Sequence, residues 1–199
     1  MKSPNTKQQI LSAALDFFSS HGYSGASIRQ IAHEVGIRES AIYNHYKSKD
    51  EIFGAILAEF NSNKISQSVL SDDLLDDLSD PEKFLTNFAM RLAQYWDSPN
   101  ERKFIRVLLM EQFTLIGQNE LSTTGYLNEL RTICKLIFEE MIKNNIIKNF
   151  DPLVLADEFT GLLFLIRAEH MSRENTRDMK MVNNLIDKHV NFFWSAVKI

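Results

Sequence analysis

The feature that most constrains this chain is a helix start that recurs along its length. In six places a Ser, Thr or Asp side chain can accept a hydrogen bond from a free N–H group of a first helical turn. Four of these starts carry Gln or Glu three residues on, which can reach back to the cap, and two place Pro directly after Asp. The starts are Thr6 with Gln9, Ser27 with Gln30, Ser48 with Glu51, Asp80 with Pro81, Ser98 with Glu101 and Asp151 with Pro152.

The stretches that follow these starts have the composition of helices. Only seven glycines and four prolines occur in 199 residues, and runs that alternate apolar and polar residues are few. We therefore expect an all-α fold of about nine helices, with the Asp-rich stretch 71–80 as a solvated connection between two of them. The predicted helices span 6–20, 27–34, 39–46, 49–68, 81–96, 99–117, 120–144, 152–173 and 176–197.

The charge of the chain is unevenly distributed. The whole sequence has a formal net charge of −4, but residues 1–50 hold six cations against four acids and are therefore net positive. A mildly basic N-terminal region followed by an acidic remainder suits local contact with phosphates rather than general binding of polyanions.

Neither membrane insertion nor secretion is expected. The longest apolar run, 162–166, is far shorter than the roughly 20 residues that cross a bilayer, and the polar residues 1–9 lack the pattern of a signal peptide. We expect a cytoplasmic protein with no membrane partner. The single cysteine, Cys134, lies in the apolar stretch 133–138 and is interpreted as a core thiol rather than a redox sensor.

Residues 27–46 have the spacing of a helix-turn-helix unit. Two short amphipathic segments meet at Gly36, which permits a sharp turn between them. Such a unit fits DNA, because the major groove admits one helix and a second helix across the backbone holds it there. The side chains expected to close its small core are Ile28, Ile31, Ala32, Ile37, Ile42 and Tyr46.

The outer face of the second short segment is polar. If Ile42 and Tyr46 face inward, the polar side chains between them point roughly the other way, where amides, carboxylates and guanidinium groups can meet base edges. The helix that begins at Ser48 presents free N–H groups and Lys49, a combination that attracts a backbone phosphate. The residues expected to contact DNA are Ser27, Arg29, Arg38, Glu39, Ser40, Tyr43, Asn44, His45 and Lys49.

Residues 6–58 resemble the N-terminal domain of the tetracycline-repressor (TetR) family. Two positions depart from the family pattern: Ala26 stands where Thr is usual, and Arg38 stands where Ser or Thr would cap the recognition helix. The resemblance implies that 27–34 is a supporting helix and 39–46 the recognition helix. It is carried by Ile10 to Phe18, Gly22-Tyr23, Ser27 to Ala32, Val35-Gly36-Ile37, Ala41 to Tyr46, Lys47-Ser48-Lys49 and Ile52-Phe53.

The resemblance also implies two domains: a helix-turn-helix DNA-binding domain of three helices over 1–48, and a C-terminal helical bundle over 49–199 that binds a ligand and dimerises. The helix near 152–173 is apolar on almost all sides, and the last helix carries an apolar stripe. Both helices must therefore pack against another apolar surface. A two-fold dimer would supply it. The expected interface residues are Phe159, Leu162, Leu163, Ile166, Val182, Ile186, His189, Val190 and Phe193.

Large and polar-tipped side chains in the same body could line an apolar pocket, although packing in a solid core explains them equally well. These candidates are Phe88, Tyr95, Phe113, Tyr126, Phe164 and His170. His33-Glu34 lacks the second histidine of a zinc-protease motif, and no catalytic arrangement is visible in the spacing. We expect no metal, no cofactor and no enzymatic activity.

The predicted function is therefore a homodimeric regulator of transcription that binds a palindromic double-stranded operator. Members of this family are usually repressors. We expect that a small apolar or amphipathic effector binds the C-terminal domain and releases the repressor from its operator. The alternative is a DNA-binding regulator whose C-terminal domain binds a protein partner instead of a small molecule.

Overall fold

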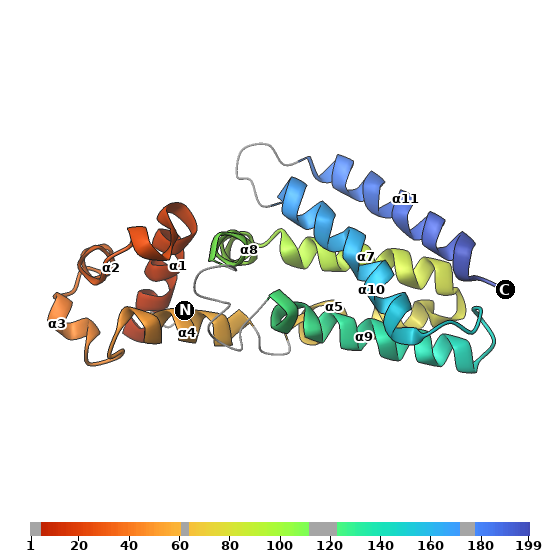
Figure 1. Cartoon of the computed structure of the whole chain (residues 1–199), viewed down its shortest axis with the longest axis horizontal. Coiled ribbons are helices and arrows are strands. Elements are labelled where there is room, and N and C mark those ends of the chain that lie inside the picture. The colour runs from red at the N-terminus through yellow and green to blue at the C-terminus, as the bar shows by residue number, and fades with distance from the viewer. Residues whose placement is uncertain (1–4, 61–63, 112–122, 172–177) are drawn as a thin grey trace. The chain divides into compact units, whose positions relative to one another are not determined.

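The computed structural model describes residues 5–60, 64–111, 123–171 and 178–199, and within these ranges the chain is almost entirely helical (Figure 1). The all-α prediction is confirmed. The α-helices are α1 (Thr6–Gly25), α2 (Ile28–Val35), α3 (Glu39–Ile42), α4 (Lys49–Phe60), α5 (Lys64–Val69), α6 (Asp72–Leu75), α7 (Pro81–Trp96), α8 (Pro99–Glu111), α9 (Thr123–Lys143), α10 (Pro152–Ile166) and α11 (Met179–Val197). A 3-10 helix, Asp76–Ser79, follows α6, and a π-helical segment, Arg167–Met171, extends α10.

The helix starts explain most of these boundaries. Ser27 and Gln30 form a reciprocal capping box at the start of α2. The side chains of Asp80 and Asp151 accept from the first turns of α7 and α10, with Pro at the first helical position in both. α1 begins at Thr6 as predicted, but its cap is Asn5 rather than Thr6, because the Asn5 side chain accepts from the Lys7 N–H.

The Asp-rich stretch 71–80 is not merely a solvated connection. It forms α6 and the 3-10 helix, and Leu74 is fully buried. Asp73 pairs with Arg91, and Asp77 pairs with Lys83 and accepts from the Asn87 amide. These contacts to α7 hold the pKa of Asp73 at about 2 and that of Asp77 below its usual value. The aspartates therefore fasten the stretch to the neighbouring helix.

The chain divides into two compact units. The first comprises Met1–Ser62 and Pro99–Tyr126, and the second comprises Asn63–Ser98 and Leu127–Ile199. This division differs from the boundary expected between residues 48 and 49, because α4 and the distant α8 both pack against α1. A boundary of function at residue 48 stays a prediction.

In the first unit, α1 is the central support. Its Ile10, Ala14 and Phe18 are fully buried, and the Phe18 ring meets the Phe53 ring of α4 edge to face at 5.7 Å. The Phe104 ring of α8 stacks on Phe60 of α4 at 4.2 Å. Aromatic contacts of this kind fix the helices that carry the helix-turn-helix unit.

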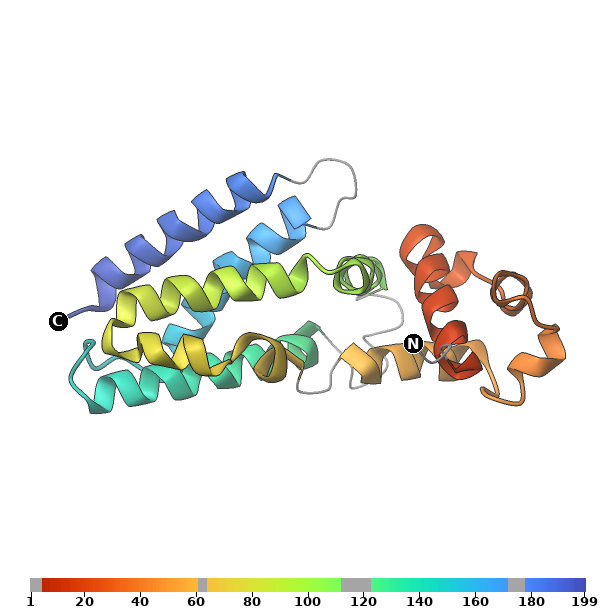
Figure 2. The ribbon, with the colours of Figure 1, turned by 180° about the vertical axis from the view of Figure 1, so that it is seen from behind.

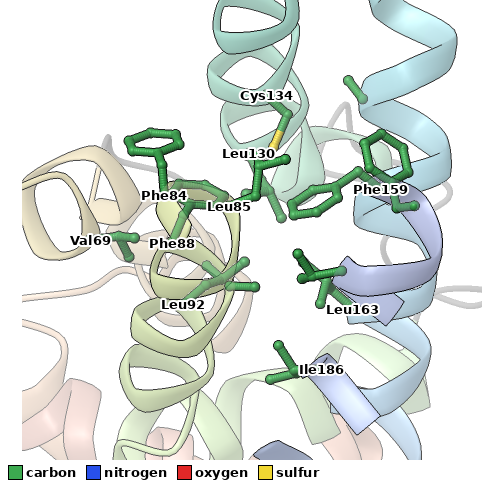
Figure 3. Close-up of a cluster of buried hydrophobic side chains, with 14 of the residues drawn as sticks. Val69, Phe84, Leu85, Phe88, Leu92, Leu130, Cys134, Phe159, Leu163 and Ile186 are labelled. Carbon is green, nitrogen blue, oxygen red and sulfur yellow. The ribbon is translucent and has the colours of Figure 1, made fainter. Parts of the chain in front are cut away.

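In the second unit, α7 and α9 run in nearly the same direction, and α10 crosses them obliquely beside α11 (Figures 1 and 2). Their inner side chains meet in one core, to which α7 contributes Phe88 and Leu92, α9 Leu130, and α10 Phe159 (Figure 3). The buried thiol of Cys134 belongs to this core, and burial raises its pKa, as expected of an inert cysteine. Among the described residues, no helix has both the length and the apolar character needed to cross a membrane.

Candidate nucleic-acid interface

The helix-turn-helix unit is built around Gly36. This residue ends α2 with φ 75° and ψ 27°, a left-handed conformation that a side chain disfavours. Two hydrogen bonds close the turn: the Gly36 N–H donates to the His33 carbonyl at 3.1 Å, and the Ile37 N–H donates to the Ala32 carbonyl at 3.0 Å. The chain thereby reverses sharply enough for α3 to follow α2 directly, as the sequence predicted.

The inner face of the unit is the one that the apolar spacing predicted. Ile31 and Ile42 are fully buried, and Ala32 and Tyr46 are 2% exposed. Of the expected core residues, Ile28 and Ile37 are only half-buried and form its edge. The core therefore holds α2 and α3 in one fixed orientation.

The predicted helix over 39–46 is an α-helix only over Glu39–Ile42, followed by tighter turns. The Asn44 N–H donates to the Ala41 carbonyl at 3.3 Å, and the His45 N–H donates to the Ile42 carbonyl at 2.8 Å. The segment thus keeps a helical course up to Tyr46, whose N–H also donates to Ile42. It is one short rod with a buried side and an open side.

The exposed side carries most of the residues that were predicted to contact DNA. Tyr43 is 51% exposed, and His45 is half-buried at the edge of the face. Arg38 precedes α3 with extended backbone, and its side chain makes no hydrogen bond to the first turn, so the usual cap is absent. The exposed members of the predicted set are Ser27, Arg29, Arg38, Glu39, Ser40, Tyr43 and Asn44.

Lys49 makes contacts within the protein that the sequence spacing did not predict. Its ammonium group donates to the carbonyl oxygens of Tyr23 and Ala26, both at 2.8 Å, and lies 4.1 Å above the centre of the Tyr23 ring. The contact ties the start of α4 to the end of α1. The lysine therefore acts first as a structural tie, with two of its three N–H bonds already directed at the protein.

Tyr23 is the residue that sequence reasoning missed. Its N–H donates to Glu111 of α8 at 2.9 Å, and its hydroxyl donates to Asp50 of α4. Burial, with help from Asp50, raises the pKa of this phenol, so it stays a donor. The only signal in the sequence was the place of Gly22-Tyr23 in the family pattern, because Glu111 lies 88 residues away.

Residues 10–56 match the family model described as bacterial regulatory proteins, tetR family. This N-terminal part of the chain is therefore similar to the TetR family. Among curated relatives, it is 31% identical over 87 residues to the transcriptional repressor AcnR of Corynebacterium efficiens, covering 42% of this chain and 46% of that protein. It is 29% identical over 110 residues to the regulator SrpR of Pseudomonas putida, covering 55% and 48% respectively. The chain thus spans about half the length of the curated relatives that it matches here.

Solved structures of regulators resemble the chain over nearly its whole length. A putative regulator from Mesorhizobium loti has a TM-score of 0.74 at 24% identity and covers 100% of both chains. The flavonoid-responsive regulator FrrA has a TM-score of 0.61 at 21% identity and covers 97% of both. At such identities the likeness concerns the fold alone.

The predicted ligand-binding residues lie in different surroundings. Phe88 is fully buried in the core of the second unit (Figure 3), whereas Phe164 and His170 are half-buried. Tyr95 lines a groove of about 620 Å³ that α5 and α7 form with polar side chains. Phe113 and the side chain of Tyr126 lie outside the described residues. The other lining residues of the groove are Ser68, Asn87, Met90, Arg91 and Gln94.

The predicted dimer surface requires correction. Eight of its nine residues are buried within the single chain, and only Leu162, at 40% exposure, lies on the surface. The stripe of α11 packs inward against α7 and α10, where the His189 ring meets the Phe159 carbonyl at 2.8 Å and burial lowers the pKa of the imidazole. The eight buried residues are Phe159, Leu163, Ile166, Val182, Ile186, His189, Val190 and Phe193.

A different set of apolar residues is exposed on the same two helices. Phe192 of α11 is 75% exposed, and Val154 and Leu165 of α10 are 55% and 48% exposed. Met181 adds a further exposed apolar side chain at the other end of α11, at 44%. We call Val154, Leu162, Leu165, Met181 and Phe192 the α10–α11 face.

Proposed function

We propose that this chain is a DNA-binding transcriptional repressor that reads its operator with the open side of α3. One observation carries the proposal: Tyr43 and its polar neighbours are exposed on a short rod whose opposite side is fixed by buried Ile42 and Tyr46. A rod of this size enters the major groove, where polar side chains reach base edges. The similarity of residues 10–56 to the TetR family and the similarity of the chain to curated repressors support the same function.

The proposed contacts to DNA fall into two groups, those to base edges and those to the phosphate backbone. Ser40 on α3, and Tyr43 and Asn44 in the turns that follow it, are proposed to meet base edges and adjacent phosphates, whereas the exposed Arg29 and Arg38 supply positive charge toward the backbone. Lys49 is proposed to act through position, because its ammonium holds the start of α4 against α1. Loss of Lys49 would then weaken DNA binding together with the stability of the first unit.

The operator is proposed to be palindromic, because the chain is expected to act as a homodimer. The α10–α11 face exposes Phe192, Leu165 and Val154, which a second copy related by two-fold symmetry would cover. Two reading units in such a dimer meet successive major grooves when their half-sites lie roughly 34 Å apart.

The regulation is proposed to depend on a small amphipathic effector bound in the second unit. The groove beside Tyr95 has a volume typical of small-molecule sites and offers amides, a guanidinium group and a thioether. One structural relative is named for its response to flavonoids, which are small amphipathic molecules. An effector that favours one conformation of the body would shift the population away from the form that fits both half-sites.

The test begins with selection of bound sequences from random duplex DNA, followed by fluorescence anisotropy on the selected operator. We expect Tyr43→Ala to weaken operator binding about tenfold or more, since one specific contact contributes roughly 1–3 kcal/mol. Phe150→Ala is the matched control, because Phe150 is an aromatic residue of similar exposure, 48% against 51%, on the second unit. Equal operator affinity of the two variants would refute the assignment of α3.

A further inference from the structure

Glu39 is the one acidic member of the nine residues predicted to contact DNA, and the contacts proposed above give it no role. It is the first residue of α3 (Figure 1), and its side chain is exposed. Tyr43 stands four residues later, a spacing that places both side chains on one side of the helical course that runs to Tyr46. In helix-turn-helix proteins the first residues of the recognition helix meet base edges. If α3 enters the groove as proposed, the Glu39 carboxylate therefore meets a base edge.

No contact within the protein occupies this carboxylate. In the part of the chain that the structure describes, the Glu39 side chain makes no hydrogen bond and no ion pair, although the exposed Arg38 directly precedes it. A carboxylate brought close to phosphates without a donor of its own is repelled, and this repulsion weakens binding to any DNA. An acidic group on this face therefore favours binding only where the duplex itself supplies a donor.

The major groove supplies such a donor from two of the four bases. Cytosine presents its N4 amine and adenine its N6 amine, whereas guanine and thymine present only acceptors among their polar groups. Adenine also carries the N7 acceptor beside its amine, which a carboxylate without a proton cannot satisfy. Glutamate is thus matched to cytosine, because each of the other three bases opposes it with at least one acceptor.

We propose that Glu39 is a specificity-determining residue that selects cytosine at one position of each operator half-site. The inference rests on the proposed function, because it requires α3 to lie in the major groove. Ser40 and Asn44 carry both donor and acceptor atoms and suit several bases, whereas Glu39 only accepts. Its charge also opposes binding to DNA that lacks the cytosine, so the same side chain favours the operator and disfavours other sequences.

A purely structural role for Glu39 predicts different results. An acidic residue in a first turn stabilises a helix, and α3 lacks a side-chain cap at Arg38. In that role Glu39 would act through the stability of α3 and affect all DNA sequences alike. Glu39→Asp separates the two roles, because it keeps the negative charge in the first turn but shortens the reach by one methylene group. We expect Glu39→Asp to unfold in urea like the parent chain, yet to lose most of the preference for cytosine.

The test compares base preferences of the full chain and its variants. Bound sequences are selected from random duplex DNA with the parent chain, Glu39→Gln and Glu39→Asp, and affinities are measured by fluorescence anisotropy on the selected operator and its single-base variants. We expect the parent chain to select cytosine at one position of each half-site and to bind each other base there about fivefold or more weakly, the size of a typical mismatch. Glu39→Gln is expected to select adenine at the same position, because an amide both accepts from N6 and donates to N7.

Affinity for random-sequence duplex isolates the effect of the charge. Glu39→Gln is expected to bind such DNA about two- to fivefold more tightly than the parent chain, the range for one exposed charge interaction. Glu158→Gln is the matched control, because it removes an exposed glutamate from α10 of the second unit. It should change neither the base preference nor the affinity for random duplex, and an equal gain in both variants would contradict the local role of Glu39.

The outcomes distinguish this inference from the function on which it rests. If the parent chain, Glu39→Gln and Glu39→Asp all select the same sequence, Glu39 does not determine specificity, while the assignment of α3 to the operator stands. If the parent chain selects no sequence, the proposed function fails and the inference fails with it.

Discussion

The helix pair α2–α3 and the helix pair α10–α11 differ in how far their sequences determine which side faces inward. In α2 and α3, apolar residues occupy one side only, so buried Ile31 and Ile42 leave exposed Tyr43 opposite. In α10, apolar residues occupy almost every side: Leu163 is 1% exposed, but its neighbour Leu162 is 40% exposed. An apolar period therefore identifies the inward face only when polar residues fill the rest of the helix.

The same difference separates the partners that the two surfaces suit. A polar face on a rigid rod offers donors and acceptors to base edges, whereas an exposed apolar face requires cover by another apolar surface. The assignment of one surface to DNA and the other to a second copy follows from this contrast. Four substitutions, ordered by the size of their expected effects, test it.

The largest effect is expected inside the second unit, at a residue first assigned to its surface. Phe159 is fully buried, and its ring lies 5.7 Å from that of Phe138 and 5.1 Å from that of Phe193. We expect Phe159→Ala to lower the free energy of unfolding by about 3–5 kcal/mol. Phe192→Ala is the control, because the same truncation at a 75% exposed site removes little packing within the chain. Urea unfolding of dilute, monomeric protein measures both, and similar losses would reverse the corrected assignment.

The second effect concerns the α10–α11 face. A fully covered Phe side chain contributes roughly 1.5–3 kcal/mol, and two-fold symmetry would use Phe192 twice. We therefore expect Phe192→Asp to weaken a dimer at least tenfold while leaving the helix content unchanged, as measured by sedimentation equilibrium and circular dichroism. Phe150→Asp is the matched control, since Phe150 is exposed but lies outside both helices. A dimer of undiminished affinity in Phe192→Asp would exclude this face.

The fold could be predicted from the sequence because its signals are local. The capping box at Ser27 and the Asp-Pro starts at Asp80 and Asp151 each involve side chains within three residues of the helix that they begin. The helical turns of 71–80 were missed, because they depend on contacts to α7 rather than on local pattern. The shortening of α3 to Glu39–Ile42 was missed as well.

The candidate site could be predicted only in part. The exposed polar side chains proposed to contact DNA follow from the one-sided pattern around Ile42. The Lys49 ammonium, in contrast, binds carbonyl groups that lie 26 and 23 positions earlier in the chain. Spacing indicated that Lys49 stands at a helix start but not that its ammonium meets two carbonyl groups. The α10–α11 face could not be chosen either, since α10 presents apolar residues on almost every side.

The third effect lies at the turn between α2 and α3. Gly36 has φ 75°, and a Cβ added there meets no atom within 4 Å, so any cost of Gly36→Ala arises from backbone strain alone. We expect a loss of about 1–2 kcal/mol in the free energy of unfolding, the cost of a left-handed conformation for an L-residue. Gly54→Ala in α4, where a Cβ also meets no atom within 4 Å, is expected to stabilise by about 0.5–1 kcal/mol. Thermal unfolding measures both, and the same sign for the two variants would contradict the geometry of the turn.

The smallest effect separates stability from DNA binding at a single position. Arg38 stands at the N-cap of α3 without capping it, so Arg38→Ser would supply a cap and raise the free energy of unfolding by about 0.5–1 kcal/mol. The same change removes a cation from the proposed interface, which should lower operator affinity and reduce the salt dependence by about one unit of slope. Arg38→Ala removes the charge without adding a cap, so it should weaken DNA binding equally but bring no gain in stability. If Arg38→Ser and Arg38→Ala unfold alike yet both bind operator as the parent chain does, then Arg38 neither displaces a cap nor contacts DNA, and the polar face of α3 ends at Glu39.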